Sequence, residues 1–178
     1  MFGNITTNSK RLPTKRGKEL FVFSSGKGLP VERRYDSGVP VYGGNGIAWY
    51  TDSPLIDHST IVIGRVGAYC GNIHIILEPA WITDNAIYIK QFKTDDFDIR
   101  FLSYLMDNAN FLSKANKSAQ PKITQKPLED FEYIIPDIKQ QKAFSKYEQQ
   151  IDKSKFIVQQ QINELQELLD KKMDEYFG

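Results

Sequence analysis

The sequence predicts an α+β protein: a curved mixed β-sheet domain with a covering helix, followed by a long C-terminal helix of the coiled-coil type. Two observations support this class. Residues 137–177 contain neither Gly nor Pro, whereas the preceding chain breaks into short apolar runs separated by glycines, which is typical of strands joined by turns. We therefore expect a folded domain at residues 1–135 and a separate helical element at residues 136–178.

The C-terminal helix has a clear start. Asp137 follows Pro136 and is expected at the N-cap, with Gln140 three residues later, as in a capping box. Near the other end, Lys171 and Lys172 suit the negative pole of the helix dipole. An apolar stripe repeats at an average spacing of about 3.6, which favours a nearly straight antiparallel helix pair over a parallel zipper. The residues expected in this dimerisation stripe are Tyr147, Ile151, Val158, Ile162, Leu165, Leu169, Met173 and Tyr176.

The length of this helix suggests a partner. A helix of about 40 residues is roughly 60 Å long, more than a domain of about 135 residues can cover. Part of the stripe is therefore expected to meet another chain, and the alternative is a helix folded back on its own domain.

The domain itself is predicted from four strand patterns and one helix. Residues 39–50 place Gly43, Gly44 and Gly46 at a tight turn between two strands. Further strands are expected at residues 59–65, 72–77 and 85–89. The covering helix is expected to be capped by Thr94, with an apolar face formed by Phe97, Phe101, Tyr104, Leu105, Ala109 and Leu112.

Composition limits the class of protein. The 178 residues are 40% hydrophobic, enough for a single core, and carry a net charge of +1. Neither a signal peptide nor a membrane-spanning segment is evident, and the single cysteine, Cys70, suits a reducing compartment, so we expect a cytoplasmic protein.

Positive charge gathers in two segments. Residues 10–34 carry eight Lys or Arg against two Glu, and residues 114–126 carry four Lys and no acid. Two basic loop segments on a nearly neutral protein indicate a phosphate-binding face, although a solvated surface has the same composition.

No catalytic motif accompanies these features. The glycines spell neither a dinucleotide fingerprint nor a phosphate loop, and no Asn-Pro-Pro-Tyr type of sequence for holding a flipped adenine is present. No elbow motif supports serine catalysis. Cys70 and His74 have ligand-like spacing but lack enough further His or Cys for a metal site, so His74 is interpreted as a strand residue. We expect no catalytic residue and no bound metal.

Five segments, in order, resemble one known family. They are VYGGNGIAWY (41–50), IVIGRVGAYCGN (61–72), WITDNAIYI (81–89), AQPKITQKPL (119–128) and YIIPDIKQQ (133–141). Together with the long helix they are similar to a target recognition domain and spacer helix of a Type I restriction–modification specificity subunit. The resemblance covers nearly the whole chain.

The resemblance implies a mechanism. Specificity subunits of this family usually carry two recognition domains and two antiparallel spacer helices, and each domain reads one half of a split sequence in double-stranded DNA. They recruit a modification subunit, which binds S-adenosylmethionine and methylates adenine at N6, and a restriction motor subunit can join. By this resemblance the chain needs no cofactor of its own.

The chain has one domain and one helix, half of the usual complement. Met1-Phe2-Gly3 and Tyr176-Phe177-Gly178 resemble the phrase that can join a spacer helix to the next domain. We expect a half-subunit, a gene fragment or a partial sequence, which homodimerises through the helix and reads a palindromic split site.

Residues expected to contact DNA are polar or basic and lie on loops. They are Lys27, Arg33, Arg34, Gly44, Asn45, Trp49, Arg65, Tyr69, Lys114, Asn116, Lys117, Ser118, Gln120 and Lys122. Three alternatives stay open: the Gly43–Gly46 turn is an ordinary hairpin, Arg65 pairs with Asp84, and Trp49 and Trp81 belong to the core.

Two other functions stay open. One is a coiled-coil adaptor whose domain binds protein and reads no DNA, and the other is an enzyme that turns over nucleic acid without a partner. The DNA sequence recognised does not follow from the residues, because no code relates such loops to bases.

Overall fold

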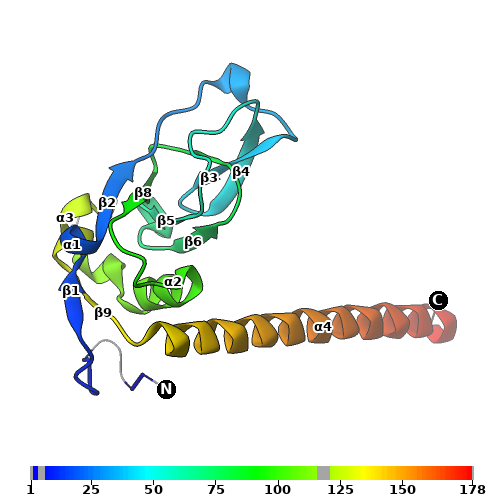
Figure 1. Ribbon diagram of the computed structural model, residues 1–178. Coiled ribbons are helices and arrows are strands. Elements are labelled where there is room, and N and C mark those ends of the chain that lie inside the picture. Colours follow the sequence, from blue (N-terminus) through cyan, green and yellow to red (C-terminus); the bar gives the residue numbers. More distant parts are fainter. Residues whose placement is uncertain (1, 4–6, 116–120, 178) are drawn as a thin grey trace.

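The α+β class is confirmed in a computed structural model, which describes residues 2–3, 7–115 and 121–177 (Figure 1). The elements follow the chain as β1 (Thr14–Arg16), α1 (Gly17–Leu20), β2 (Phe21–Ser25), η1 (Val31–Arg33), β3 (Val39–Gly43), β4 (Gly46–Thr51), β5 (Thr60–Gly64), η2 (Gly67–Tyr69), β6 (Ile73–Ile76), β7 (Trp81–Ile82), β8 (Ala86–Phe92), α2 (Ile99–Asn108), η3 (Phe111–Lys114), α3 (Gln125–Asp130), β9 (Glu132–Ile134) and α4 (Ile138–Phe177).

The strands divide among three sheets. The largest has the order β2-β8-β5-β6, the second has the order β4-β3-β7, and β1 pairs with β9 in a small ribbon. All pairings in the largest sheet are antiparallel, whereas β3 and β7 run parallel, so the strand set is mixed. The ribbon joins the start of the domain to the segment that enters α4.

Strand β5 is buried along its whole length because both faces of the largest sheet are covered. Ile61 and Ile63 face a core shared with α2, whereas Val62 faces a smaller core with Ile82 and Tyr88. A strand covered on both faces needs apolar side chains at successive positions, which explains its continuous apolar run.

Helix α2 covers the sheet, as expected, but its predicted cap is wrong. Asp98 is the N-cap, and its side chain accepts hydrogen bonds from the amides of Arg100 and Phe101. The Thr94 hydroxyl accepts from the Asp96 amide instead, in a local turn that precedes the helix. Phe97 therefore lies before the helix, and Leu112 lies in η3.

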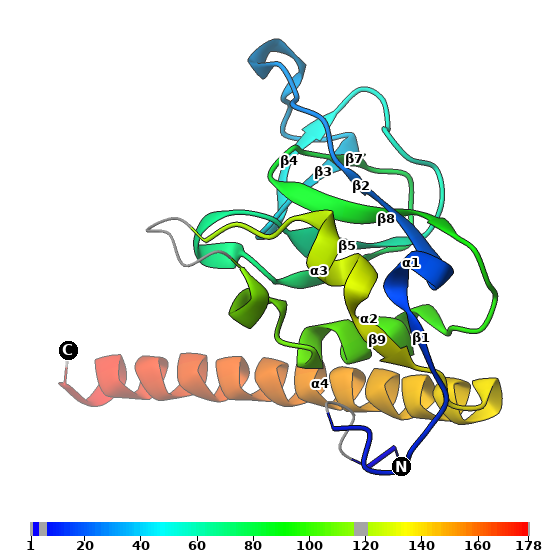
Figure 2. The same ribbon diagram turned by 90° about the vertical axis from the view of Figure 1, so that its left-hand side faces the viewer.

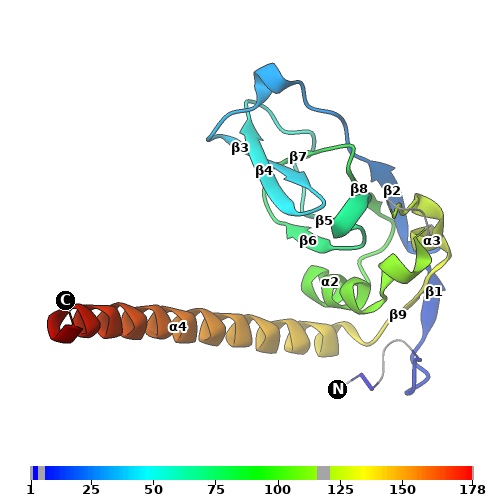
Figure 3. The same cartoon turned by 180° about the vertical axis from the view of Figure 1, so that it is seen from behind.

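Helix α4 leaves the domain as a rod (Figures 1 and 2). Its N-cap is as predicted, because the Asp137 side chain accepts from the Lys139 amide at 2.8 Å. Gln141 and Ser145 are its only buried residues among those described, and every described residue from Ile151 to Phe177 is exposed. In the view from behind, α2 lies between α4 and the sheets, and the β3–β4 hairpin is on the far side of the domain (Figure 3).

Candidate nucleic-acid interface

The glycine-rich turn is a hairpin, as predicted. Gly43 pairs with Gly46, and Gly46 has a φ of +90°, which glycine adopts without strain. A side chain at Gly44 would lie 3.3 Å from the Cα of Gly64, and His74 Nε2 lies 3.1 Å from the Gly44 carbonyl oxygen. These close contacts hold the hairpin against strands β5 and β6, and they give Gly44 a structural role.

A hollow of about 360 Å³ opens beside this turn. It brings together four of the residues predicted to contact DNA, namely Gly44, Asn45, Trp49 and Tyr69. Its remaining walls are Gly43, Gly46, Ile47, Ala48, Val66, Thr83 and Asn85. The hollow is therefore built from three segments that are far apart in sequence.

Thr83 and Asn85 are lining residues that the sequence did not single out. The Asn85 side chain is exposed and, like that of Asn45, has no hydrogen-bond partner in the described chain. The Thr83 hydroxyl is buried, and within the described residues it also has no partner. A free amide beside a hollow can pair with the edge of a base, because it offers both a donor and an acceptor. The only signal in the sequence was their place in the TDN triplet between two apolar runs.

Arg33 and Arg34 lie over aromatic rings near this region. The Arg34 guanidinium lies 4.3 Å from the ring centre of Trp49, and that of Arg33 lies 5.0 Å from that of Trp81. Trp49 is 36% exposed, and neither tryptophan belongs to a buried core, so the core alternative is wrong for both. A cation–π contact restrains the position of each guanidinium, whose N–H groups are donors suited to phosphate or base contact.

The charge of Arg33 is partly neutralised by an ion pair within the domain. Its guanidinium hydrogen-bonds the Asp52 carboxylate, and this contact lowers the pKa of Asp52. Lys27 is exposed, and its backbone carbonyl accepts a hydrogen bond from the Trp81 indole at 2.9 Å. Lys27 and Arg34, unlike Arg33, have no carboxylate partner among the described residues.

Arg65 directly precedes an isolated β-bridge, in which Val66 pairs with Lys122. Arg65 donates to the backbone carbonyl of Asp84 at 3.3 Å, and no contact joins it to the Asp84 carboxylate. It lines a second hollow of about 340 Å³ with Ser25, Ile87, Thr124, Gln125, Lys126 and Glu129. Lys122, from the second basic segment, is thus paired with Val66, which lines the first hollow.

Five predicted DNA contacts remain, at positions 114, 116–118 and 120. Lys114 ends η3. Asn116, Lys117, Ser118 and Gln120 lie outside the described residues.

Cys70 is a buried free thiol whose pKa is raised by burial, and its Sγ lies 3.3 Å from the Arg65 carbonyl oxygen.

Neither a metal centre nor a membrane segment was found in the part of the chain that the structure describes. No group of three or more His, Cys, Asp or Glu is close enough there to hold a metal ion. No helix among the described residues is long and apolar enough to cross a membrane.

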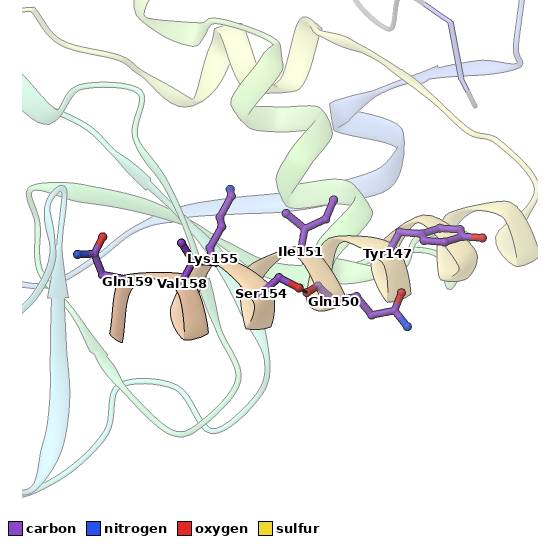
Figure 4. A pocket seen from close by; sticks show the side chains of 7 residues that line it. All are labelled: Tyr147, Gln150, Ile151, Ser154, Lys155, Val158 and Gln159. Atoms are coloured by element: carbon purple, nitrogen blue, oxygen red, sulfur yellow. Dashed lines mark hydrogen bonds between the residues drawn. The ribbon is translucent and has the colours of Figure 1, made fainter. Parts of the chain in front are cut away.

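All eight residues predicted in the dimerisation stripe are exposed on α4. Tyr147, Ile151 and Val158 line an open groove of about 640 Å³ on the helix surface (Figure 4). Its polar lining is Gln150, Ser154, Lys155 and Gln159. Phe156, Ile157 and Leu168 are also exposed and lie off the predicted stripe, so the apolar surface of the helix is wider than its periodicity indicated.

Comparison with known proteins agrees with this architecture. A family model described as the Type I restriction modification DNA specificity domain matches residues 13–167. The Type I restriction enzyme EcoprrI specificity subunit of Escherichia coli is 30% identical over 112 residues, which is 62% of this chain and 27% of that protein.

Solved structures have the same fold at low identity. The S subunit of a Type I restriction–modification system from M. genitalium has a TM-score of 0.69 at 22% identity, over 90% of this chain and 44% of that one. The HsdS subunit from Thermoanaerobacter tengcongensis has a TM-score of 0.57 at 19% identity, over 80% of this chain and 37% of that one.

A structure describing assembly of the Type I system has a TM-score of 0.61 at 18% identity, over 96% of this chain and 46% of that one. This chain therefore spans less than half the length of each relative described here. It belongs to the Type I restriction–modification DNA specificity domain family.

Proposed function

We propose that this chain reads one half of a split DNA sequence, pairs with a second copy through α4, and recruits a modification subunit that methylates the DNA. Family membership supports the reading role. The observation that carries the pairing is the exposed apolar face of α4, along which Ile162, Leu165 and Leu169 are each more than half exposed.

Burying this face supplies the driving force for association. A buried leucine or isoleucine side chain contributes about 1.5–3 kcal/mol relative to an exposed one. Eight stripe residues on each of two helices therefore offer more than enough apolar surface to offset the entropy cost of dimerisation.

The charges of α4 favour an antiparallel pair. Residues 138–157 carry five Lys against Glu148 and Asp152, a net charge of +3. Residues 158–177 carry five acids against Lys171 and Lys172, a net charge of −3. An antiparallel arrangement places the positive half of each helix beside the negative half of the other, whereas a parallel one places like charges together.

The methylation chemistry is assigned to the partner. The modification subunit would bind S-adenosylmethionine and transfer its methyl group to adenine N6, while this chain supplies DNA recognition. A restriction motor subunit would join the same assembly in the cytoplasm, where the chromosome is accessible. The relatives named as a Type I specificity subunit and as part of a Type I assembly support this assignment.

The pairing is tested by light scattering on the purified chain at tens of micromolar. We expect a dimer, and we expect Leu165→Glu to shift it to monomer because a charge on the buried stripe is costly. Gln160→Glu is the matched control, since Gln160 lies on the opposite side of the helix. A monomeric parent chain would contradict the pairing.

The recognition role is tested by mapping N6-methyladenine in a host that carries the modification subunit, with and without this chain. A split palindromic motif that appears only with the chain is expected. Absence of a new motif, with both proteins soluble, would refute the proposal and favour the adaptor function.

A further inference from the structure

The joint between α4 and the domain contains a fully buried glutamine. Gln141 has no exposed surface. Its Nε2 donates to the backbone carbonyls of Asp96 and Pro136, both at 2.8 Å, and its Oε1 accepts from the Asp98 amide at 3.0 Å. One side chain thus satisfies three backbone groups in the segments that precede α2 and α4.

The same joint ties α4 to α2 through Asp98. The Ser145 hydroxyl donates to Asp98 Oδ1, the oxygen that also caps the first amides of α2. Ser145 lies one turn after Gln141 on the same helical face. The start of α2 and the first two turns of α4 are consequently held as one unit.

Aromatic packing completes the joint. The ring centre of Phe144 lies 4.7 Å from that of Tyr104, 5.7 Å from that of Phe2 and 5.9 Å from that of Phe101. Because the described helix from Ile151 onward is exposed, the direction and the rotation of the rod are decided in these first turns.

Rotation of α4 matters because two different faces of the helix are used. At 100° per residue, the joint face of Gln141 and Ser145 lies roughly 120°, a third of a turn, from the stripe of Tyr147, Ile151 and Val158. Fixing the joint face fixes where the stripe points. The stripe in turn decides where the domain of a second, antiparallel copy is placed.

DNA is sensitive to such a placement. B-form DNA turns once in about 10.5 base pairs, so one added base pair rotates a half-site by about 34° and moves it by about 3.4 Å. A domain that swings by a few tens of degrees would therefore meet a half-site at a neighbouring spacing.

We infer that Gln141 is a positioning residue whose buried amide makes the dimer select the number of base pairs between its two half-sites. This inference rests on the proposed function. It concerns the distance between the DNA half-sites and leaves the base sequence of each half to the hollow beside the β3–β4 hairpin.

The test uses the full chain with its modification subunit, after the methylation map has given the parent's motif and spacer length. Methylation is measured on duplexes that carry the same half-sites at the parent spacing and at one base pair more or less. Gln141→Ala is expected to lower the preference for the parent spacing by about tenfold, since three hydrogen bonds are lost. The half-site sequence is expected to stay the same.

Gln140→Ala is the control, because Gln140 is an exposed neighbour of the same residue type. It should keep the parent preference. Ser145→Ala removes one hydrogen bond of the joint and provides a milder test should Gln141→Ala not fold; it is expected to relax the spacing in the same direction.

An unchanged spacing preference in a folded Gln141→Ala protein, or in Ser145→Ala when the former is insoluble, would overturn the inference. Equal weakening at all three spacings would also overturn it, since that result indicates a role in stability alone. Failure of the parent chain to direct any methylation would instead refute the proposed function.

Discussion

Single side chains around the hairpin decide what the domain presents to DNA. Asn45 and Asn85 are 40 positions apart in the sequence and line one hollow, where their amides have no partner among the described residues. Arg34 is held over Trp49 on the outer strand of the same hairpin. The arrangement separates a polar surface for bases from a cation suited to phosphate.

At this scale we predict that Asn85→Ala weakens binding to the recognised half-site about 5–150-fold, because a lost base contact costs about 1–3 kcal/mol. Binding to unrelated duplexes, and its dependence on salt, should not change, since no cation is removed. Competition binding with specific and unrelated duplexes measures both quantities. Asn72→Ala, an exposed asparagine outside the hollow, is the control, and equal loss on both duplexes would contradict the role of Asn85.

The elements are fixed by caps and close backbone contacts. The side chain of Asp98 caps α2 and accepts the Ser145 hydroxyl, so it serves two helices. Gly17 is constrained by a neighbouring segment of the chain, because a side chain there would lie 2.1 Å from the Leu128 carbonyl oxygen. These positions tolerate few other residues although they are far from the hollow.

For the elements we predict that Asp98→Ala lowers the free energy of unfolding by about 1–2 kcal/mol, from the lost cap and the lost side-chain hydrogen bond. Urea unfolding followed by far-ultraviolet circular dichroism provides the measurement. Asp95→Ala, an exposed acid in the preceding loop, should change stability little. If the two variants unfold at the same urea concentration, the Asp98 contacts contribute nothing to stability.

At the scale of the whole molecule, the hairpin region and the exposed length of α4 lie on opposite sides of α2 (Figure 3). The opposite charges of the two halves of α4 belong to this scale, because their effect appears only when two chains meet. They favour the same antiparallel direction as the spacing of the apolar stripe, and they do so by an independent physical argument.

We predict that a chain with Lys146, Lys153 and Lys155 changed to Glu dimerises more weakly than the parent, because both halves of its helix are then negative. A second chain with Glu164, Glu167 and Asp170 changed to Lys should also self-associate weakly. Mixing the two should restore pairing in low salt, since a helix that is negative throughout then meets one that is positive throughout. Analytical ultracentrifugation of each chain and of the mixture measures this.

A parallel pair predicts a different pattern. There the parent places like charges together, so either set of reversals would leave self-association unchanged or strengthen it. That outcome would contradict the antiparallel arrangement.

The sequence by itself determined the elements whose pattern is local. Helix α4, its cap at Asp137 and the hairpin around Gly44 were predicted because neighbouring residues decide periodicity, capping and turns. The five ordered segments also indicated the family that the comparison confirmed.

Only the tertiary structure decided which distant residues meet. Gln141 and Asp98 are 43 positions apart, and no local pattern marks a polar residue in the first turns of a helix as fully buried. The place of Asn85 beside Asn45 depends on the docking of the hairpin against β5 and β6, which His74 and Gly64 permit. Such contacts follow from strand order and from the packing of separate sheets, so the site and the joint became visible only once the chain had folded.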